Sequence, residues 1–242
     1  MRRLLVLSAM GLAGTLAAAS PAAAKARAVV CDDVITGSTL RADVTVPTGG
    51  TCRLVNSTVR GDIRIRANGY FQATNTKVRG DVRGKRAQTI FLEGGSAVRG
   101  DVEADRTAQV FVFASKVGGE IDIVRATDKV NVCGNSVRGS IEVEKSGTDI
   151  LVGDPLALDC PGNVVKRGDI EVQDNATDVE LVVRGNTISR GNLEVRRNGG
   201  PSGKFVEDNK GGAKLDCRGN SQPFNASGNT GWRKTSGQCS VP

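Results

Sequence analysis

The sequence has no histidine among its 242 residues. This absence excludes Ser-His-Asp and Cys-His catalysis, because both mechanisms use an imidazole as the general base. It also removes the most common metal-binding side chain, and no Cys-x-x-Cys pair is present to hold zinc in its place. The sequence therefore indicates no catalytic residue, no metal site and no cofactor.

Aromatic residues are scarce, at 3% of the chain, whereas glycine occurs 31 times. A compact globular core usually depends on large side chains. Here the apolar residues are mostly Val, Ile, Leu and Ala in short runs, which is typical of many short strands with tight turns. The few aromatic rings and the lack of a long basic tract argue against a nucleic-acid partner. The net charge of +7, or +5 without Arg2 and Arg3, mildly favours contact with anionic surfaces.

The N-terminus has the pattern of an export signal. Arg2 and Arg3 precede an apolar run from Leu4 to Ala19, and a small-residue cleavage site of the A-x-A kind follows at 22–24. The run is too short and too rich in Ala and Gly for a good membrane span, and no later stretch is long enough for one. We therefore expect a secreted or cell-wall-associated protein with no membrane span after cleavage. An N-terminal membrane anchor or a core helix is the alternative.

A repeat dominates the rest of the chain. Three copies read Val-Arg-Gly-Asp followed by Ile or Val, and two more read Val-Gly-Gly-Glu-Ile and Val-Arg-Gly-Ser-Ile. The glycines of these five copies recur every 19 or 20 residues, at Gly61, Gly80, Gly100, Gly119 and Gly139. Two looser copies follow around Gly168 and Gly191. A period near 20 residues is typical of solenoids, in which each repeat buries its apolar side only by stacking on its neighbours.

Each repeat contains the elements of one coil. A valine precedes the glycine by two residues, and glycine suits a sharp corner with unusual backbone angles. Alternating aliphatics such as Ile63 and Ile65 follow, and a second strand such as Ile90 to Leu92 completes the coil. The predicted fold is an all-β, single-stranded, parallel, right-handed β-helix of about 20 residues per coil, with roughly eight or nine coils. A β-sandwich also has short alternating strands, but it does not explain the repeated motif.

The six cysteines suggest disulfides in an exported protein. They fall into three pairs about one coil apart, which we predict as Cys31–Cys52, Cys133–Cys160 and Cys217–Cys239. The outer two pairs would close the coil ends, whose strand edges otherwise invite end-to-end oligomers. The Gly-, Asn- and Ser-rich tail is expected to be irregular around the last coils. The predicted organisation is a signal peptide at 1–24, an N-terminal cap and first coil at 25–56, β-helix repeats at 57–197, and C-terminal coils and cap at 198–242.

Three features resemble a known family. They are Val44-Thr-Val-Pro-x-Gly-x-Thr-Cys52, the recurring Val-x-Gly-[Asp/Asn]-[Ile/Val/Leu], and the closing Leu215-x-Cys217-x-Gly-Asn220 with Gly237-Gln-Cys239. Together they resemble secreted β-helical repeat proteins of actinobacteria, whose function is unknown, so the resemblance implies an architecture and no activity. The body is also similar to bactofilins, polymer-forming β-helical proteins that lack the export signal and the paired cysteines.

The repeat should stack its charged residues into two rows. One row contains Arg60, Arg79, Arg99 and Arg138, and a second, two residues further along, contains Asp62, Asp81, Asp101, Glu120 and Asp169. One interpretation is mutual neutralisation at a solvated corner. The other is a cationic row that binds an anionic polymer, because the guanidinium fork suits phosphate and carboxylate. The repeat itself accounts for the four Arg-Gly-Asp tripeptides, and interleaved arginines disfavour Ca²⁺ on the acidic row.

We therefore expect a secreted, non-enzymatic structural or binding protein of the cell envelope or extracellular space, which contacts an anionic cell-wall polymer or polysaccharide through its arginine row. The alternative is a polysaccharide-active β-helix enzyme, pectate-lyase-like or tailspike-like, since such folds carry carboxylate or Arg–Ca²⁺ chemistry. The segments that depart most from the repeat, Asp154–Arg167 and the surroundings of Trp232, are where carboxylates would have to converge.

Overall fold

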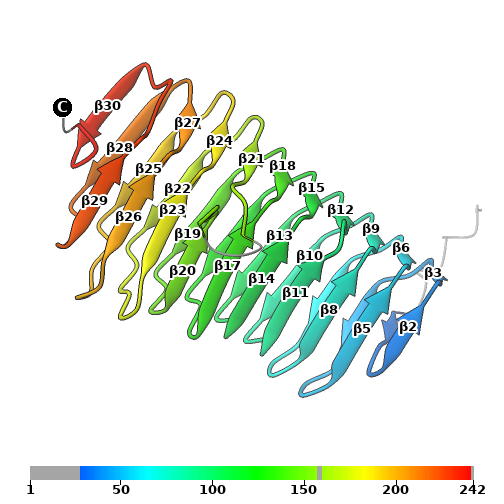
Figure 1. Cartoon of the computed structure of the whole chain (residues 1–242). Coiled ribbons are helices and arrows are strands. Elements are labelled where there is room, and N and C mark those ends of the chain that lie inside the picture. The colour runs from blue at the N-terminus through cyan, green and yellow to red at the C-terminus, as the bar shows by residue number, and fades with distance from the viewer. Residues whose placement is uncertain (1–27, 157–159, 241–242) are drawn as a thin grey trace, which may run out of the picture.

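The computed structural model describes residues 28–156 and 160–240. Within these residues it has no helix and confirms the predicted all-β parallel solenoid. The chain passes through three sheets in turn, once per coil, and the stacked coils form an elongated body (Figure 1). The predicted signal peptide lies outside the described residues. There are about ten coils, rather than the eight or nine expected, because both ends of the described chain also form strands.

The three sheets contain eleven, ten and nine strands in the described chain, and every pair of neighbours is parallel. Sheet A contains β1 (Val29–Val30), β4 (Val44–Val46), β7 (Ile63–Ile65), β10 (Val82–Lys85), β13 (Val102–Asp105), β16 (Ile121–Val124), β19 (Ile141–Glu144), β22 (Ile170–Gln173), β25 (Leu193–Arg196), β28 (Lys214–Arg218) and β30 (Lys234–Gly237). Sheet B contains β2 (Val34–Thr36), β5 (Thr51–Val55), β8 (Tyr70–Thr74), β11 (Thr89–Glu93), β14 (Gln109–Phe113), β17 (Lys129–Cys133), β20 (Asp149–Val152), β23 (Leu181–Arg184), β26 (Lys204–Glu207) and β29 (Phe224–Ser227). Sheet C contains β3 (Thr39–Leu40), β6 (Thr58–Val59), β9 (Lys77–Val78), β12 (Ala97–Val98), β15 (Lys116–Val117), β18 (Ser136–Val137), β21 (Val164–Val165), β24 (Thr187–Ile188) and β27 (Lys210–Gly211).

The core is a column of aliphatic side chains inside the coils. In most of the longer strands the residues alternate between the core and the surface, so that β19 buries Ile141 and Val143 and presents Glu142 and Glu144 outward. Parallel pairing without a register shift then stacks like on like, for example Ile121 on Ile141. The predicted inward valines of the repeat are all buried, at Val59, Val78, Val98, Val117 and Val137.

Buried polar side chains close the corner between sheets B and C. Small hydroxyl residues in the early coils give way to asparagines in the later ones, at Ser57, Thr76, Ser96, Ser115, Asn135, Asn163, Asn186 and Asn209. The Asn163 Nδ2 donates to the Val132 carbonyl at 2.7 Å and to the Asn186 Oδ1 at 2.9 Å. Its Oδ1 accepts the Asn135 backbone N–H at 3.0 Å. The ladder thereby satisfies backbone groups that would otherwise be buried without partners.

A second asparagine ladder overturns the prediction for the tail. The tail from Asn198 on was predicted to contain the last coils and a cap, with irregular structure around them, but β26 to β30 continue all three sheets through the described part of the tail. Asn198 stacks between Asn175 and Asn220, with side-chain contacts of 2.9 and 3.0 Å. Here amide hydrogen bonds maintain the coil where aliphatic residues are few, so low strand propensity did not prevent strand formation.

The repeat glycines stack in one column, as predicted, but not for the reason expected. Gly80 donates its N–H to the Gly61 carbonyl at 3.3 Å, and Gly100 donates to Gly80 at 3.2 Å. None of them has a positive φ; a Cβ on Gly100 would instead lie 1.8 Å from the Asp81 Oδ1. Glycine is required because successive coils approach closely at this corner. Positive φ occurs at other corners, for example at Asn56.

The structure contains the three predicted disulfides, Cys31–Cys52, Cys133–Cys160 and Cys217–Cys239. The middle bond attaches the longest connection, between β20 and β21, to the end of β17. No helix among the described residues is long and apolar enough to cross a membrane.

Candidate functional site

The outer face of sheet C carries lysine in alternate coils. Parallel pairing places Thr58, Lys77, Ala97, Lys116 and Ser136 in one outward row. The strands are about 4.8 Å apart, so the two lysines are separated by about 10 Å. The small residues between them leave hollows, and the row forms part of an open groove of about 640 Å³.

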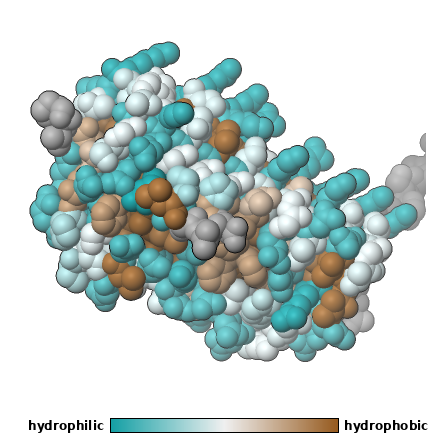
Figure 2. All heavy atoms as spheres, viewed as in Figure 1, coloured by the Kyte–Doolittle hydropathy of each residue, from teal (hydrophilic) through white to brown (hydrophobic). Residues whose placement is uncertain are grey.

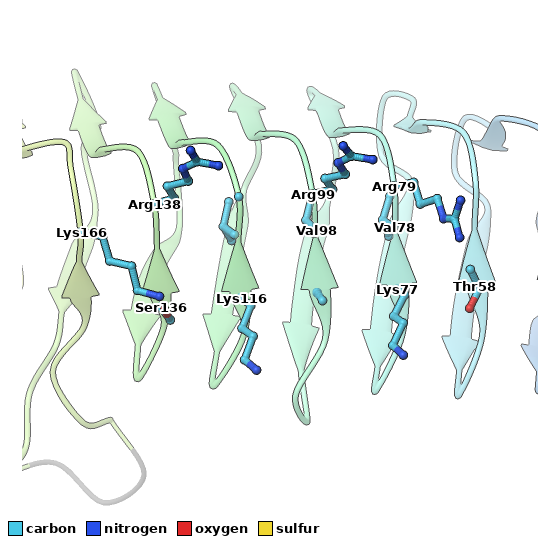
Figure 3. Close-up of a pocket in the computed structure, with 13 residues that line it drawn as sticks. Thr58, Lys77, Val78, Arg79, Val98, Arg99, Lys116, Ser136, Arg138 and Lys166 are labelled. Carbon is cyan, nitrogen blue, oxygen red and sulfur yellow. The ribbon is translucent and has the colours of Figure 1, made fainter.

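Arginines line the edge of this groove, where each coil leaves sheet C. The structure brings Arg79, Arg99 and Arg138 to the groove, as the predicted row requires, and Arg60 lies one coil before them. All four are exposed. Figure 3 shows the arginines above the strands and Lys77 and Lys116 projecting from them. We call the six basic groove residues the cationic face: Lys77, Arg79, Arg99, Lys116, Arg138 and Lys166.

The cationic face is not neutralised by the acidic row, so the predicted mutual neutralisation is wrong for the described residues. No side chain of the cationic face forms an ion pair or a hydrogen bond with any described residue. The Asp62 and Asp81 Oδ1 atoms instead accept the backbone N–H of the next coil, at 3.2 and 2.9 Å. Their Oδ2 atoms pair with Arg64 and Arg83, at 2.9 and 2.8 Å.

These aspartates therefore have a structural role that the sequence did not reveal. Each one links its coil to the next through a charge-assisted hydrogen bond to the backbone, and its second oxygen faces sheet A. The arginine of the same Arg-Gly-Asp tripeptide points away, toward sheet C. Along the edge where β6 to β21 lie, Figure 2 shows hydrophilic side chains projecting in succession.

Comparison with protein-family models, with curated proteins and with solved structures finds no match. The resemblance to actinobacterial repeat proteins and to bactofilins stays a prediction, and the site has to be interpreted from its own chemistry.

The two segments that depart from the repeat have their described acidic groups engaged. Asp154 pairs with Arg184 at 2.7 Å, and Arg184 also pairs with Glu207 at 2.5 Å. The Trp232 ring lies over Gly211, and its Nε1 is buried without a hydrogen-bond partner among the described residues. No group of three or more potential ligands in the described chain is arranged to hold a metal ion.

Sequence reasoning missed the two groove lysines and a set of phenylalanines. The lysines were visible as the residue before the repeat valine in alternate copies. Phe91, Phe111 and Phe113 lie outward on sheet B, with ring centroids 5.5 to 6.0 Å apart. Cross-strand aromatic contacts of this kind stabilise a sheet.

Sequence reasoning also missed a row of carboxylates on the outer face of sheet A. The register stacks one acidic residue per coil over six coils. The sixth, Asp216, is buried and paired with Arg196, Lys214 and Arg218. The first five are Glu103, Asp122, Glu142, Glu171 and Glu194. We call these five residues the acid row. Burial, followed by repulsion from neighbouring carboxylates, raises the pKa of Glu142 to about 7. The same two causes raise the pKa of Asp122 and of Glu171. In the sequence, the acid row is visible as an acidic residue between the two inward-facing aliphatic residues of each of these strands.

Proposed function

We propose that this protein is a non-enzymatic binding or structural protein of the cell envelope or extracellular space, and that its cationic face holds an extended anionic polymer such as a cell-wall glycopolymer. The observation that carries the proposal is the set of unpaired basic side chains repeating along one groove. The aspartates that follow Arg79 and Arg99 in sequence, Asp81 and Asp101, instead accept backbone N–H groups of the next coil.

The geometry favours a polymer over a small ligand. The groove is open and runs across several coils, so no single pocket encloses a small molecule. Its charges repeat with the coil spacing of about 4.8 Å, and a chain of regularly spaced anions can contact several of them at once. Arg79, Arg99 and Arg138 supply forked donors for phosphate or carboxylate, and the hollows beside Ala97 and Ser136 leave space for backbone or sugar atoms.

The test is binding of the purified protein to isolated cell walls and to three defined polymers at low salt: poly(glycerol phosphate), polygalacturonate and neutral dextran. We expect binding to the two polyanions and none to dextran. The affinity should fall steeply with added salt, because exposed charges are screened over about 10 Å at 0.1 M. Equal binding to dextran would overturn an electrostatic mechanism, and release of new reducing ends from polygalacturonate would overturn the non-enzymatic assignment.

A triple variant locates the binding face. Arg79→Gln, Arg99→Gln and Arg138→Gln together should cost about 2 kcal/mol, taking less than 1 kcal/mol per exposed charge, which is about 30-fold in Kd. The matched control removes the same charge from the corner between sheets A and B, by changing Arg86, Arg106 and Arg125 to Gln. Equal losses in the two triple variants would show that net charge, and not the cationic face, binds the polymer.

A further inference from the structure

The acid row presents charge that the rest of the described chain does not compensate. Its ends have partners: Glu103 is 3.0 Å from the Arg83 Nε, and Glu194 pairs with Arg196 at 2.7 Å. The central residues Asp122, Glu142 and Glu171 form no ion pair within the described chain. Parallel pairing sets them on adjacent strands, about 4.8 Å apart, so three like charges face water at close range.

Such a row favours a cationic partner. Like charges directly opposite one another on neighbouring strands destabilise a sheet. Such repulsion is the second cause, after burial, of the raised pKa of Glu142. A surface of opposite sign would remove this repulsion when it docks. The acid row is flat, polar and part of a regular sheet, so the partner must bring several cations at the same repeat distance to pair with all three carboxylates.

The cationic face of the same protein is a surface with several cations at the coil spacing. The cationic face spans the five strands β9, β12, β15, β18 and β21, and the acid row spans the five strands β13, β16, β19, β22 and β25. Both follow the spacing of the same coils, so their periods agree by construction. When two copies lie side by side, the cations of one can therefore face the carboxylates of the other on successive coils. A globular partner with irregularly spaced charges would not match this spacing.

We propose that the acid row of one copy docks on the cationic face of a second copy, side by side. The two faces lie on different sheets, so the contact is heterologous, and each copy keeps one face free for the next. Lys77 and Lys116 reach the carboxylates, and the hollows over Ala97 and Ser136 accept the intervening side chains. This assembly goes beyond polymer binding, because it assigns a role to sheet A. It also makes the polymer and the second copy competitors for the cationic face.

Charge reversal tests the pairing. One variant reverses the acid row (Asp122→Lys, Glu142→Lys, Glu171→Lys), and another reverses the cationic face (Lys77→Glu, Arg99→Glu, Lys116→Glu). Sedimentation at low salt and pH 8 should show association of the parent, loss of association in each variant, and its recovery in an equimolar mixture of the two. A monomeric parent, or a mixture that stays monomeric, overturns the proposal. Association that survives both reversals also overturns it and indicates end-to-end contacts through the strand edges.

A variant that neutralises the acid row controls for misfolding and distinguishes self-association from polymer binding. Asp122→Asn, Glu142→Gln and Glu171→Gln relieve the repulsion, so the variant should fold at least as well as the parent by circular dichroism. It should lose self-association and bind poly(glycerol phosphate) at least as tightly as the parent, because no second copy competes for the cationic face. Self-association equal to that of the parent overturns the docking of the acid row. If the parent protein self-associates but does not bind poly(glycerol phosphate), the proposed function is refuted and this inference stands.

Discussion

Glu142 lies at the centre of the acid row, and replacing it with glutamine removes one charge without changing the shape of the side chain. Its carboxyl has Asp122 and Glu171 on the adjacent strands, with Glu120 and Glu144 also close enough to raise its pKa. The pKa rises from 4.5 to about 7. One pKa unit corresponds to about 1.4 kcal/mol, so the charged form is disfavoured by at most about 3 kcal/mol. Because the side chain is partly exposed, solvent screening reduces the expected effect to about 1 kcal/mol.

The effect of Glu142→Gln on the free energy of unfolding should depend on pH. The pKa of Glu142 is higher in the folded than in the unfolded protein, so the folded state binds the proton more tightly. The cost of the charge is therefore fully present above about pH 7 and disappears as the pH falls toward 4.5. Glu142→Gln should raise the free energy of unfolding by about 1 kcal/mol at pH 8, and this gain should vanish at pH 4.

Urea unfolding with the disulfides intact, at pH 4, 6 and 8, measures the effect. The matched control is Glu103→Gln, in the same row, whose carboxylate is paired with Arg83 and should give no gain at pH 8. The reasoning fails if Glu142→Gln does not stabilise at pH 8, if its gain is the same at pH 4, or if Glu103→Gln stabilises equally. An NMR titration that places the Glu142 pKa near 4.5 would refute it directly.

Three further changes test the packing of the coils. Gly100→Ala places a Cβ 1.8 Å from the Asp81 Oδ1 of the previous coil and should lower the free energy of unfolding by about 1–3 kcal/mol. The control Gly147→Ala, whose Cβ would have no atom nearer than 3.8 Å, should change stability little. An unchanged urea midpoint for Gly100→Ala would contradict the close approach of the coils. Asn186→Ala leaves buried ladder groups unpaired and should lower the free energy of unfolding by about 1–3 kcal/mol. Replacing Cys31 and Cys52 together by serine opens a loop with a sequence separation of 21 and should cost about 3 kcal/mol; equal stability of the reduced and oxidised parent would contradict this.

Much of the fold could be predicted because the repeat encodes it locally. A valine such as Val98, two residues before a glycine that recurs every 19 or 20 residues, shows where a coil turns and which side faces inward. The cysteine pairs followed from the same period, since residues one coil apart lie on neighbouring strands. The tail was harder to predict, because Asn198 and its partners stabilise coils through hydrogen bonds between coils, which strand propensity does not describe.

The candidate site was predicted in part. The arginine row is where the repeat puts it, but its relation to the aspartates was wrong. From spacing alone, Arg79 and Asp81 are two residues apart and appear to be partners. In the structure the glycine corner between them turns the two side chains toward different sheets, and Asp81 bonds the backbone of the next coil and Arg83. The lysines and the acid row were present in the pattern, but only the strand register shows that they form continuous rows.

The sequence by itself determined the coil period, the inward aliphatic positions, the glycine column and the disulfide pairs, because each depends only on residues recurring at a fixed interval. The tertiary structure alone decided which charges have partners. Ion pairing depends on distances of a few ångströms across a corner and between coils, and on competition from backbone N–H groups that no residue type reveals. That competition occupies the aspartates and leaves the cationic face without a partner in the described chain, which is why the proposed binding surface becomes visible only when the coils are stacked.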